Sequence, residues 1–311
     1  MASGPVTERP GAPGAHAEAA PSIVTVVRAH VASLRPQQWV KNILVAAAPL
    51  ASGQLLSSPN LSRTAITFVV FCLASSATYL VNDVSDVATD RLHPMKRYRP
   101  VAAGTVLPAT ALVGSVVLAG VALVLSWTLI SPQLAGVVAL YLAINAAYSW
   151  GLKNQAVFDL AAVSAGFLLR AIAGGVATSV PLSQWFLLVA AFGSLFMVAG
   201  KRFADLHGGT PQDPRAPARV SYSATYLRFV WGMAGAATIV FYALWSVGVG
   251  HHHQVWAQIS VAPFVFALMR YAMDVDRGVT GAPEEVVLRD RGLQLLGLLW
   301  LITFVVAAGA S

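Results

Sequence analysis

Long apolar stretches alternate with short polar connections along this 311-residue chain. A helix needs about 20 mostly apolar residues to cross the roughly 30 Å hydrocarbon core of a bilayer. Nine stretches come close enough to that length to be candidate transmembrane helices. They cover residues 42–59, 62–82, 105–130, 134–150, 156–178, 184–200, 229–250, 255–273 and 293–310. The pattern therefore predicts an all-α, polytopic membrane protein with nine transmembrane helices.

The beginning of the chain lacks this pattern. Residues 1–20 are rich in Pro, Gly and Ala and contain few large apolar side chains, so they cannot bury enough surface to fold. They also lack the apolar core of a secretory signal peptide. We expect residues 1–27 to form a disordered cytoplasmic tail and residues 28–311 to form one membrane domain.

Composition supports the same class. With 57% hydrophobic and 11% charged residues, the chain is too apolar for an ordinary soluble domain. The single cysteine, Cys72, excludes an internal disulfide. The formal net charge is +7, but its cations stand beside apolar spans and no nucleic-acid motif accompanies them. We therefore expect anionic headgroups and phosphorylated substrates as partners, and no nucleic acid.

The distribution of charge predicts the orientation in the membrane. If the N-terminus is cytoplasmic, nearly all Lys and Arg residues fall on the inner side, and only Arg63 lies outside. All Asp and Glu residues fall on the inner side as well. We expect a multi-pass protein of the inner (plasma) membrane whose N-terminus and active site face the cytoplasm.

The most informative polar segment, residues 82–100, follows the second apolar stretch. It contains Asn82 and three aspartates, Asp83, Asp86 and Asp90, which are three and four residues apart. On one continuous helix these carboxylates fall within about 60° of one another. Carboxylates gathered at a membrane surface favour a hard divalent cation, most often Mg²⁺. The alternative is an acidic helix end that is simply solvated.

Three cations follow the aspartates in the same segment. Lys96, Arg97 and Arg99 lie between Pro94 and Pro100. Ammonium and guanidinium groups are the usual donors to phosphate oxygens. Together with the aspartates, they predict a site for a metal ion and a diphosphate.

A second charged group stands at the inner end of the sixth stretch, where Lys201 and Arg202 precede Asp205. Lys201 and Asp205 are four residues apart, so a plain helical ion pair is one interpretation. The other makes Asp205 a ligand of a second metal or an acceptor for a ribose hydroxyl, with Lys201 and Arg202 on phosphate. In the second case, removal of Asp205 abolishes turnover and leaves the fold intact.

Four further charged residues are candidates for substrate contacts. Lys41 and Lys153 suit either a substrate phosphate or an anchor at the membrane interface. Asp159 lies just inside a predicted span, where a carboxylate needs a partner. Arg170 lies deeper in the same span, and it either meets a phosphate or carboxylate inside the bundle or extends outward to water.

The pattern Asn82-Asp83-x-x-Asp86-x-x-x-Asp90 resembles the acidic signature of the UbiA-type intramembrane prenyltransferase superfamily. More narrowly, the chain is similar to the actinobacterial decaprenyl-phosphate phosphoribosyltransferases. The similarity runs from about residue 35 to 296. Its specific blocks are 35–42, 93–100, 151–154, 169–175, 200–202, 226–231 and 288–290.

The resemblance implies a UbiA-like helical bundle that uses Mg²⁺ to transfer 5-phosphoribose from phosphoribosyl diphosphate to a polyprenyl (decaprenyl) phosphate. The product would be the lipid-linked precursor of cell-wall arabinan. It implies that Asp83, Asp86 and Asp90 are the catalytic metal ligands. The implied substrate-binding residues are Lys41, Asn82, Lys96, Arg97, Arg99, Lys153, Asp159, Arg170, Lys201, Arg202 and Asp205. One departure concerns the second acidic site, where many superfamily members have a D-x-x-x-D pair and this chain has only Asp205.

Two other functions stay open from the sequence. An aromatic or haem-type prenyltransferase of the same superfamily would place a prenyl diphosphate on the metal. A transporter could line a path with the same polar groups, although the acids gather at one membrane face. The small residues 171–177 permit close helix packing, so a homo-oligomer also stays open.

Overall fold

The computed structural model describes residues 23–207, 222–248, 254–279 and 283–309. Residues 1–22 of the predicted tail lie outside the described residues. Residues 23–27 belong to helix α1 (Ile23–Ser33), so the helical chain begins earlier than the predicted boundary at residue 28. The apolar side chains of Ile23, Val24 and Val27 give this helix an exposed hydrophobic face.

Helices make up all the regular structure of the described residues. Eight of them are long and apolar enough to cross a membrane, which confirms the prediction of an all-α, multi-pass membrane protein. These helices are α3 (Ser58–Ser85), α5 (Pro108–Leu125, continued by the π-helical turn Ser126–Ile130), α6 (Pro132–Trp150), α7 (Phe158–Thr178), α8 (Gln184–His207), α9 (Ala224–Gly248), α10 (Gln254–Asp276) and α12 (Arg291–Gly309). Shorter helices are α2 (Ala47–Ala51), α4 (Val87–Leu92) and α11 (Pro283–Arg289), with 3₁₀ turns η2 (Lys96–Tyr98) and η4 (Leu152–Asn154).

The first predicted span, residues 42–59, is not a single α-helix, which corrects the prediction of nine regular spans. The chain instead forms a 3₁₀-helix, η1 (Pro36–Ala46), followed by the five-residue α2. Pro49 has no backbone N–H to donate to the Val45 carbonyl four residues earlier, so an α-helix cannot continue there undisturbed. Because a 3₁₀-helix rises about 2.0 Å per residue, η1 and α2 together still extend about 30 Å.

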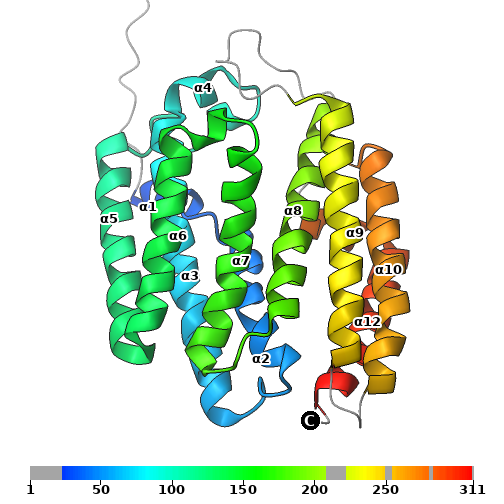
Figure 1. The fold of residues 1–311 in the computed structure, drawn as a ribbon. Helices are drawn as coiled ribbons and strands as arrows, with labels where there is room; N and C mark the ends of the chain where they lie inside the picture. Colours follow the sequence, from blue (N-terminus) through cyan, green and yellow to red (C-terminus); the bar gives the residue numbers. More distant parts are fainter. Residues whose placement is uncertain (1–22, 208–221, 249–253, 280–282, 310–311) are drawn as a thin grey trace, which may run out of the picture.

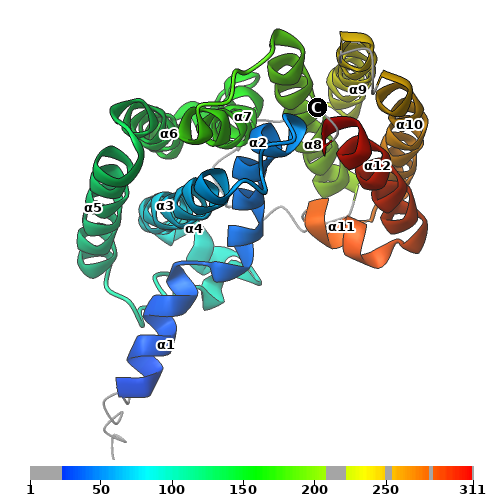
Figure 2. The same cartoon turned by 90° about the horizontal axis from the view of Figure 1, so that it is seen from below.

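The long helices lie roughly side by side, with α4 at one end of the bundle and α2 at the other (Figure 1). Seen along the bundle, η1 and α3 lie inside an arc formed by the other long helices (Figure 2). The ends at Ser85, Trp150, Phe158 and His207 therefore meet at the α4 end. This end carries most of the charged side chains discussed below.

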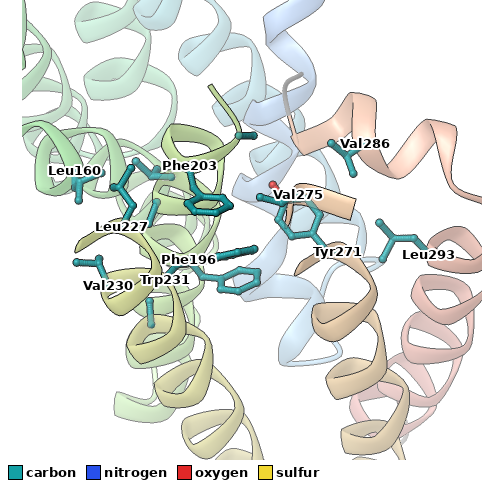
Figure 3. Packing of buried hydrophobic residues seen from close by; sticks show 14 residues of the cluster. Leu160, Phe196, Phe203, Leu227, Val230, Trp231, Tyr271, Val275, Val286 and Leu293 are labelled. Carbon is teal, nitrogen blue, oxygen red and sulfur yellow. The ribbon is translucent and has the colours of Figure 1, made fainter. Parts of the chain in front are cut away.

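Two hydrophobic clusters hold the bundle together. One joins α3, α6 and α7 through residues such as Phe71, Leu134 and Leu169. The other joins α8, α9 and α10, where the rings of Phe196, Phe203, Trp231 and Tyr271 pack against one another (Figure 3). The site described next lies at the α4 end, between helices that these clusters fix in place.

Candidate functional site

A cavity of about 320 Å³ lies among η1, α3, α6, α7 and α8. Five of its lining residues are basic, and no Asp or Glu lines it within the described part of the chain. The basic residues are Arg35, Lys41, Arg170, Lys201 and Arg202. A cavity of this character is suited to an anionic ligand.

Asn82, Asp83, Asp86 and Asp90, together the acidic cassette, lie beside this cavity, but its three aspartates do not share one continuous helix. Helix α3 ends at Ser85, Asp86 adopts φ −98° and ψ 3°, and α4 begins at Val87. Asp83 and Asp90 both contact Arg99, whereas Asp86 contacts Lys153. This corrects the prediction that the three aspartates stand on one face of a single continuous helix.

Asp83 and Asp90 are both buried, and Arg99 links them. The Arg99 guanidinium lies 2.6 Å from Asp90 Oδ2 and 3.4 Å from Asp83 Oδ1. Asp83 also forms an ion pair with Arg35, which stands before η1 in the left-handed region at φ 54°. The structure thus brings Arg99 to the acidic cassette, as the order of residues in the segment suggested.

Asp86 takes a different partner. Its Oδ1 lies 2.5 Å from Lys153 Nζ, and Lys153 also donates to Ser85 Oγ at 3.1 Å. Lys153 belongs to the η4 turn that joins α6 to α7. The loop between these helices is therefore tied directly to the end of α3.

Asp159 sits in the first turn of α7 and is 3% exposed. Arg202 of α8 binds both of its carboxylate oxygens, at 2.7 and 3.0 Å. The hydroxyl groups of Tyr148 and Tyr222 donate to the same carboxylate at 3.1 and 3.4 Å. Burial, together with the Asp159 carboxylate, raises the pKa of Tyr222 to about 12, so this phenol stays a hydrogen-bond donor at neutral pH. The partner that the sequence required for Asp159 is Arg202.

Lys201 and Asp205 form the simple pair that their spacing allowed. The Nζ–Oδ1 distance is 3.4 Å, and both side chains are about 40% exposed. Lys201 lines the cavity and Asp205 does not.

Of three further predicted phosphate ligands, one lines the cavity and two do not. Lys41 lines the cavity and donates to Gln38 Oε1 at 2.5 Å. Arg97 is exposed and donates to the hydroxyl of Tyr98 at 2.7 Å. Lys96 is half-buried, and neither it nor Arg97 lines the cavity.

Arg170 of α7 is buried deep in the bundle. Its guanidinium donates to Asn42 Oδ1 at 2.7 Å, to the Gly166 carbonyl at 2.7 Å and to the Tyr141 hydroxyl at 3.0 Å. The side chain therefore faces the bundle interior and does not extend outward to water.

The oxygen donors of the cassette fit Mg²⁺. Besides the three carboxylates, Asn82 presents a buried Oδ1 that has no hydrogen-bond partner among the described residues, and Asn82 lines the cavity. No three Asp, Glu, His or Cys side chains of the described residues form a complete ligand set. Mg²⁺ is usually held by one or two carboxylates and by substrate phosphates, so a complete protein set is not needed.

Sequence reasoning missed several residues of the site. Arg35 pairs with Asp83, and both Asn42 and Tyr141 hold Arg170. Asn42 is a polar amide at the start of an apolar stretch, so the sequence alone could have marked it as a candidate. In the structure its side chain is fully buried. Tyr141 gave no such signal, because a tyrosine within a membrane span is common near the interface.

The fold and the site together define an integral membrane protein with a cationic cavity flanked by aspartates. The chain matches the UbiA prenyltransferase family over residues 43–293 and belongs to this family.

Two relatives are similar over most of the chain. The decaprenyl-phosphate phosphoribosyltransferase of Mycobacterium tuberculosis is 51% identical over 280 residues, which cover 88% of this chain and 92% of the relative. The protein of the same name from Corynebacterium glutamicum is 50% identical over 287 residues, which cover 89% of this chain and 86% of the relative.

Solved structures share the fold at low sequence identity. A UbiA homolog from Archaeoglobus fulgidus bound to DMAPP and Mg²⁺ has a TM-score of 0.71 and 13% identity, covering 91% of this chain and 99% of that chain. A digeranylgeranylglyceryl phosphate synthase structure has a TM-score of 0.62 and 16% identity, covering 92% and 99%. These two structures confirm the UbiA-like bundle.

Proposed function

We propose that this protein transfers 5-phosphoribose from phosphoribosyl diphosphate to a polyprenyl phosphate, with decaprenyl phosphate as the acceptor, and releases diphosphate. Two relatives that are 50% and 51% identical carry the name of this activity. The observation in the structure that supports it most directly is the cavity with five basic lining residues beside the acidic cassette. An anionic donor with phosphate groups at both ends matches that charge.

The acidic cassette would bind the diphosphate of the donor. Asp83, Asp86 and Asp90, with the Asn82 amide oxygen, would hold Mg²⁺, which neutralises the charge that develops on the leaving diphosphate. Arg35, Arg99 and Lys153 already contact these carboxylates, so they can exchange a carboxylate for a phosphate oxygen as the donor enters.

The reaction substitutes one oxygen for another at C1 of the ribose. An oxygen of the acceptor phosphate forms the new C1–O bond, and the C1–O bond to the diphosphate breaks with its electron pair. A phosphate monoester is anionic near neutral pH, so no strong general base is required. Basic side chains around the cavity stabilise the charge on the diphosphate as the bond breaks.

We place this chemistry at the cytoplasmic face of the plasma membrane, because the basic residues gather at the α4 end of the bundle and such residues are enriched on the cytoplasmic side. The acceptor would leave its isoprenoid chain in the bilayer and present its phosphate at that face. The product would then serve as the lipid-linked precursor of cell-wall arabinan.

Transfer can be tested with the purified full-length protein in lipid nanodiscs. Labelled phosphoribosyl diphosphate and decaprenyl phosphate should yield a labelled lipid in the presence of Mg²⁺, and EDTA should abolish the product until Mg²⁺ is restored. Replacing Asp83 by Asn should lower kcat by about 100-fold or more. A protein that instead transfers a prenyl group from DMAPP to an aromatic acceptor, and forms no labelled lipid, would contradict the proposal.

A further inference from the structure

Arg170 differs from Arg35, Lys201 and Arg202, three of the other basic residues of the cavity. It is 5% exposed, and no Asp or Glu of the described residues lies within ion-pair distance of it. In contrast, Arg35 is paired with Asp83, Lys201 with Asp205, and Arg202 with Asp159. Within the described residues, no carboxylate therefore compensates the positive charge of Arg170 inside the bundle.

The hydrogen bonds of Arg170 leave part of its donor capacity unused. A guanidinium has five N–H groups. Three are used, by the oxygens of Asn42, Gly166 and Tyr141, and all three acceptors are neutral. The guanidinium also lies 4.9 Å from the centre of the Tyr141 ring. Two N–H groups stay available in a side chain that lines the cavity.

The depth of Arg170 makes this arrangement costly without a ligand. It lies twelve residues after Phe158, the first residue of α7, which corresponds to about 18 Å along the helix. Its bond to Gly166 shows that the side chain points back by about one turn, toward the cassette end of the cavity. A buried cation with only neutral partners is expensive at membrane depth, and an anion in the cavity would offset that cost.

We propose that Arg170 is a specificity-determining residue that binds the 5-phosphate of the phosphoribosyl donor at the floor of the cavity. This inference rests on the proposed function. The diphosphate end of the donor would meet the cassette through Asn82 and Arg35, which line the same cavity. The phosphate at the other end of the ribose would then reach toward Arg170, Tyr141 and Lys41.

The same arrangement would discriminate against a prenyl diphosphate. An isoprenoid chain in this position would leave the guanidinium without a counter-ion and would remove it further from water. This role differs from one sequence-based interpretation, in which Lys201 and Arg202 bind a substrate phosphate. Arg202 is held by both oxygens of Asp159, whereas Arg170 has no competing carboxylate among the described residues.

The test compares ligand binding by the wild-type protein and by Arg170→Gln. Ribose 5-phosphate, ribose and Mg²⁺ pyrophosphate are added separately, and the shift in melting temperature is measured. We expect ribose 5-phosphate to stabilise the wild type more than ribose does, and Arg170→Gln to lose this difference. Stabilisation by Mg²⁺ pyrophosphate should be the same in both proteins.

Kinetics supply the second readout. Arg170→Gln should raise the KM for phosphoribosyl diphosphate by about 10- to 100-fold, with a smaller change in kcat. The reason is that the lost charge-assisted hydrogen bonds have the same strength in the ground state and in the transition state. Tyr141→Phe removes one neutral hydroxyl from the same pocket and keeps the charge of Arg170, so it should raise KM less than Arg170→Gln does. If Arg170→Gln does not fold, Arg170→Lys retains the charge and should give an intermediate KM.

Two results would overturn the inference. One is an Arg170→Gln or Arg170→Lys variant that melts at a lower temperature but keeps the wild-type KM. The same holds if such a variant keeps the preference for ribose 5-phosphate over ribose. Either outcome would assign Arg170 a purely structural role. The other is a wild-type protein that does not distinguish ribose 5-phosphate from ribose. If the wild type binds ribose 5-phosphate through Arg170 but transfers nothing from phosphoribosyl diphosphate, the proposed function fails and the anion site stands.

Discussion

Four buried aspartates at the α4 end of the bundle each contact a basic side chain. Asp83 pairs with Arg35, Asp90 with Arg99, Asp86 with Lys153, and Asp159 with Arg202. An unpaired carboxylate is costly in a buried, membrane-embedded position, which is why each has a partner. The sequence indicated the need for a protein partner only at Asp159, and three of the four pairs join segments that lie far apart along the chain.

The Asp159 and Asp205 pairs predict opposite outcomes for similar substitutions. Asp159→Asn leaves Arg202 in a site where it has lost its carboxylate, and we expect a loss of about 3–5 kcal/mol of stability together with most of the activity. Asp205→Asn breaks a pair that is about 40% exposed on both sides, so the expected loss is below about 1 kcal/mol. Melting temperatures in detergent and transfer rates measure both.

This expectation follows the first of the two sequence-based interpretations, a plain ion pair, and not the second, in which removal of Asp205 abolishes turnover. A catalytic Asp205 would need its carboxylate at the cavity, and the carboxylate does not line it. An inactive but well-folded Asp205→Asn variant would restore the original interpretation.

The element that departs most from a regular helix, η1, is also the one that places Arg35, Lys41 and Asn42 at the site. It packs against α7 so closely that a Cβ at Gly174 would overlap the Val45 carbonyl group. The lack of a side chain at Gly174 therefore positions η1. A propensity argument alone would treat this glycine as a weak point of α7.

Two Gly→Ala substitutions separate packing from propensity. Ala is the better helix former by about 1 kcal/mol. At Gly136 of α6 a new Cβ meets no neighbouring atom within 4 Å, so Gly136→Ala should be neutral or slightly stabilising. Gly174→Ala should instead cost about 1–3 kcal/mol and reduce transfer, because the backbone of η1 must move. Equal melting temperatures for the two variants would contradict the close packing of η1.

The start of α12 shows an electrostatic effect at the scale of a single element. Asp290 Oδ1 accepts a hydrogen bond from the Leu293 backbone N–H at 2.8 Å, and Oδ2 lies 2.8 Å from the Arg270 guanidinium. The N–H group and the guanidinium lower the pKa of Asp290 to about 2. The carboxylate therefore caps α12 and joins it to α10.

This pKa shift predicts a pH dependence. A carboxyl group whose pKa is lower in the folded state contributes stability above its unfolded value, near 4, and the contribution is lost as pH falls toward 2. Asp290→Asn can keep the cap but not the charge. The melting temperature of the wild type should exceed that of Asp290→Asn at pH 7, and the difference should shrink as pH falls below 4. A difference that is independent of pH would show that the charge of Asp290 does not contribute.

At the scale of the whole molecule, the bundle brings η1, α3, α6, α7 and α8 together around the cavity. Figure 1 shows α4 at one end of the bundle and α2 at the opposite end. The positive-inside rule predicts that the α4 end faces the cytoplasm. This predicted orientation depends on how the helices alternate as well as on the charge of each loop.

Cysteine labelling tests this orientation. Gln155 is exposed just before α7, and Gln184 is exposed at the first residue of α8, after α7 has crossed the bundle. In a Cys72→Ser background, Gln184→Cys should react with a membrane-impermeant maleimide in intact cells, whereas Gln155→Cys should react only after the cells are opened. The reverse result would place the cavity on the outer face.

The sequence alone determined the all-α membrane class, the acidic cassette and the basic residues near it, because hydrophobic length and charge spacing are local properties of the chain. It could not determine which cation meets which aspartate, since those pairs depend on which helix ends are packed together. Nor could it show that Asp86 lies at a break between two helices, or that η1 is not an α-helix. Tertiary structure also decided that Arg170 faces a cavity with neutral partners only, because its charge environment is made by η1, α6 and α7 together.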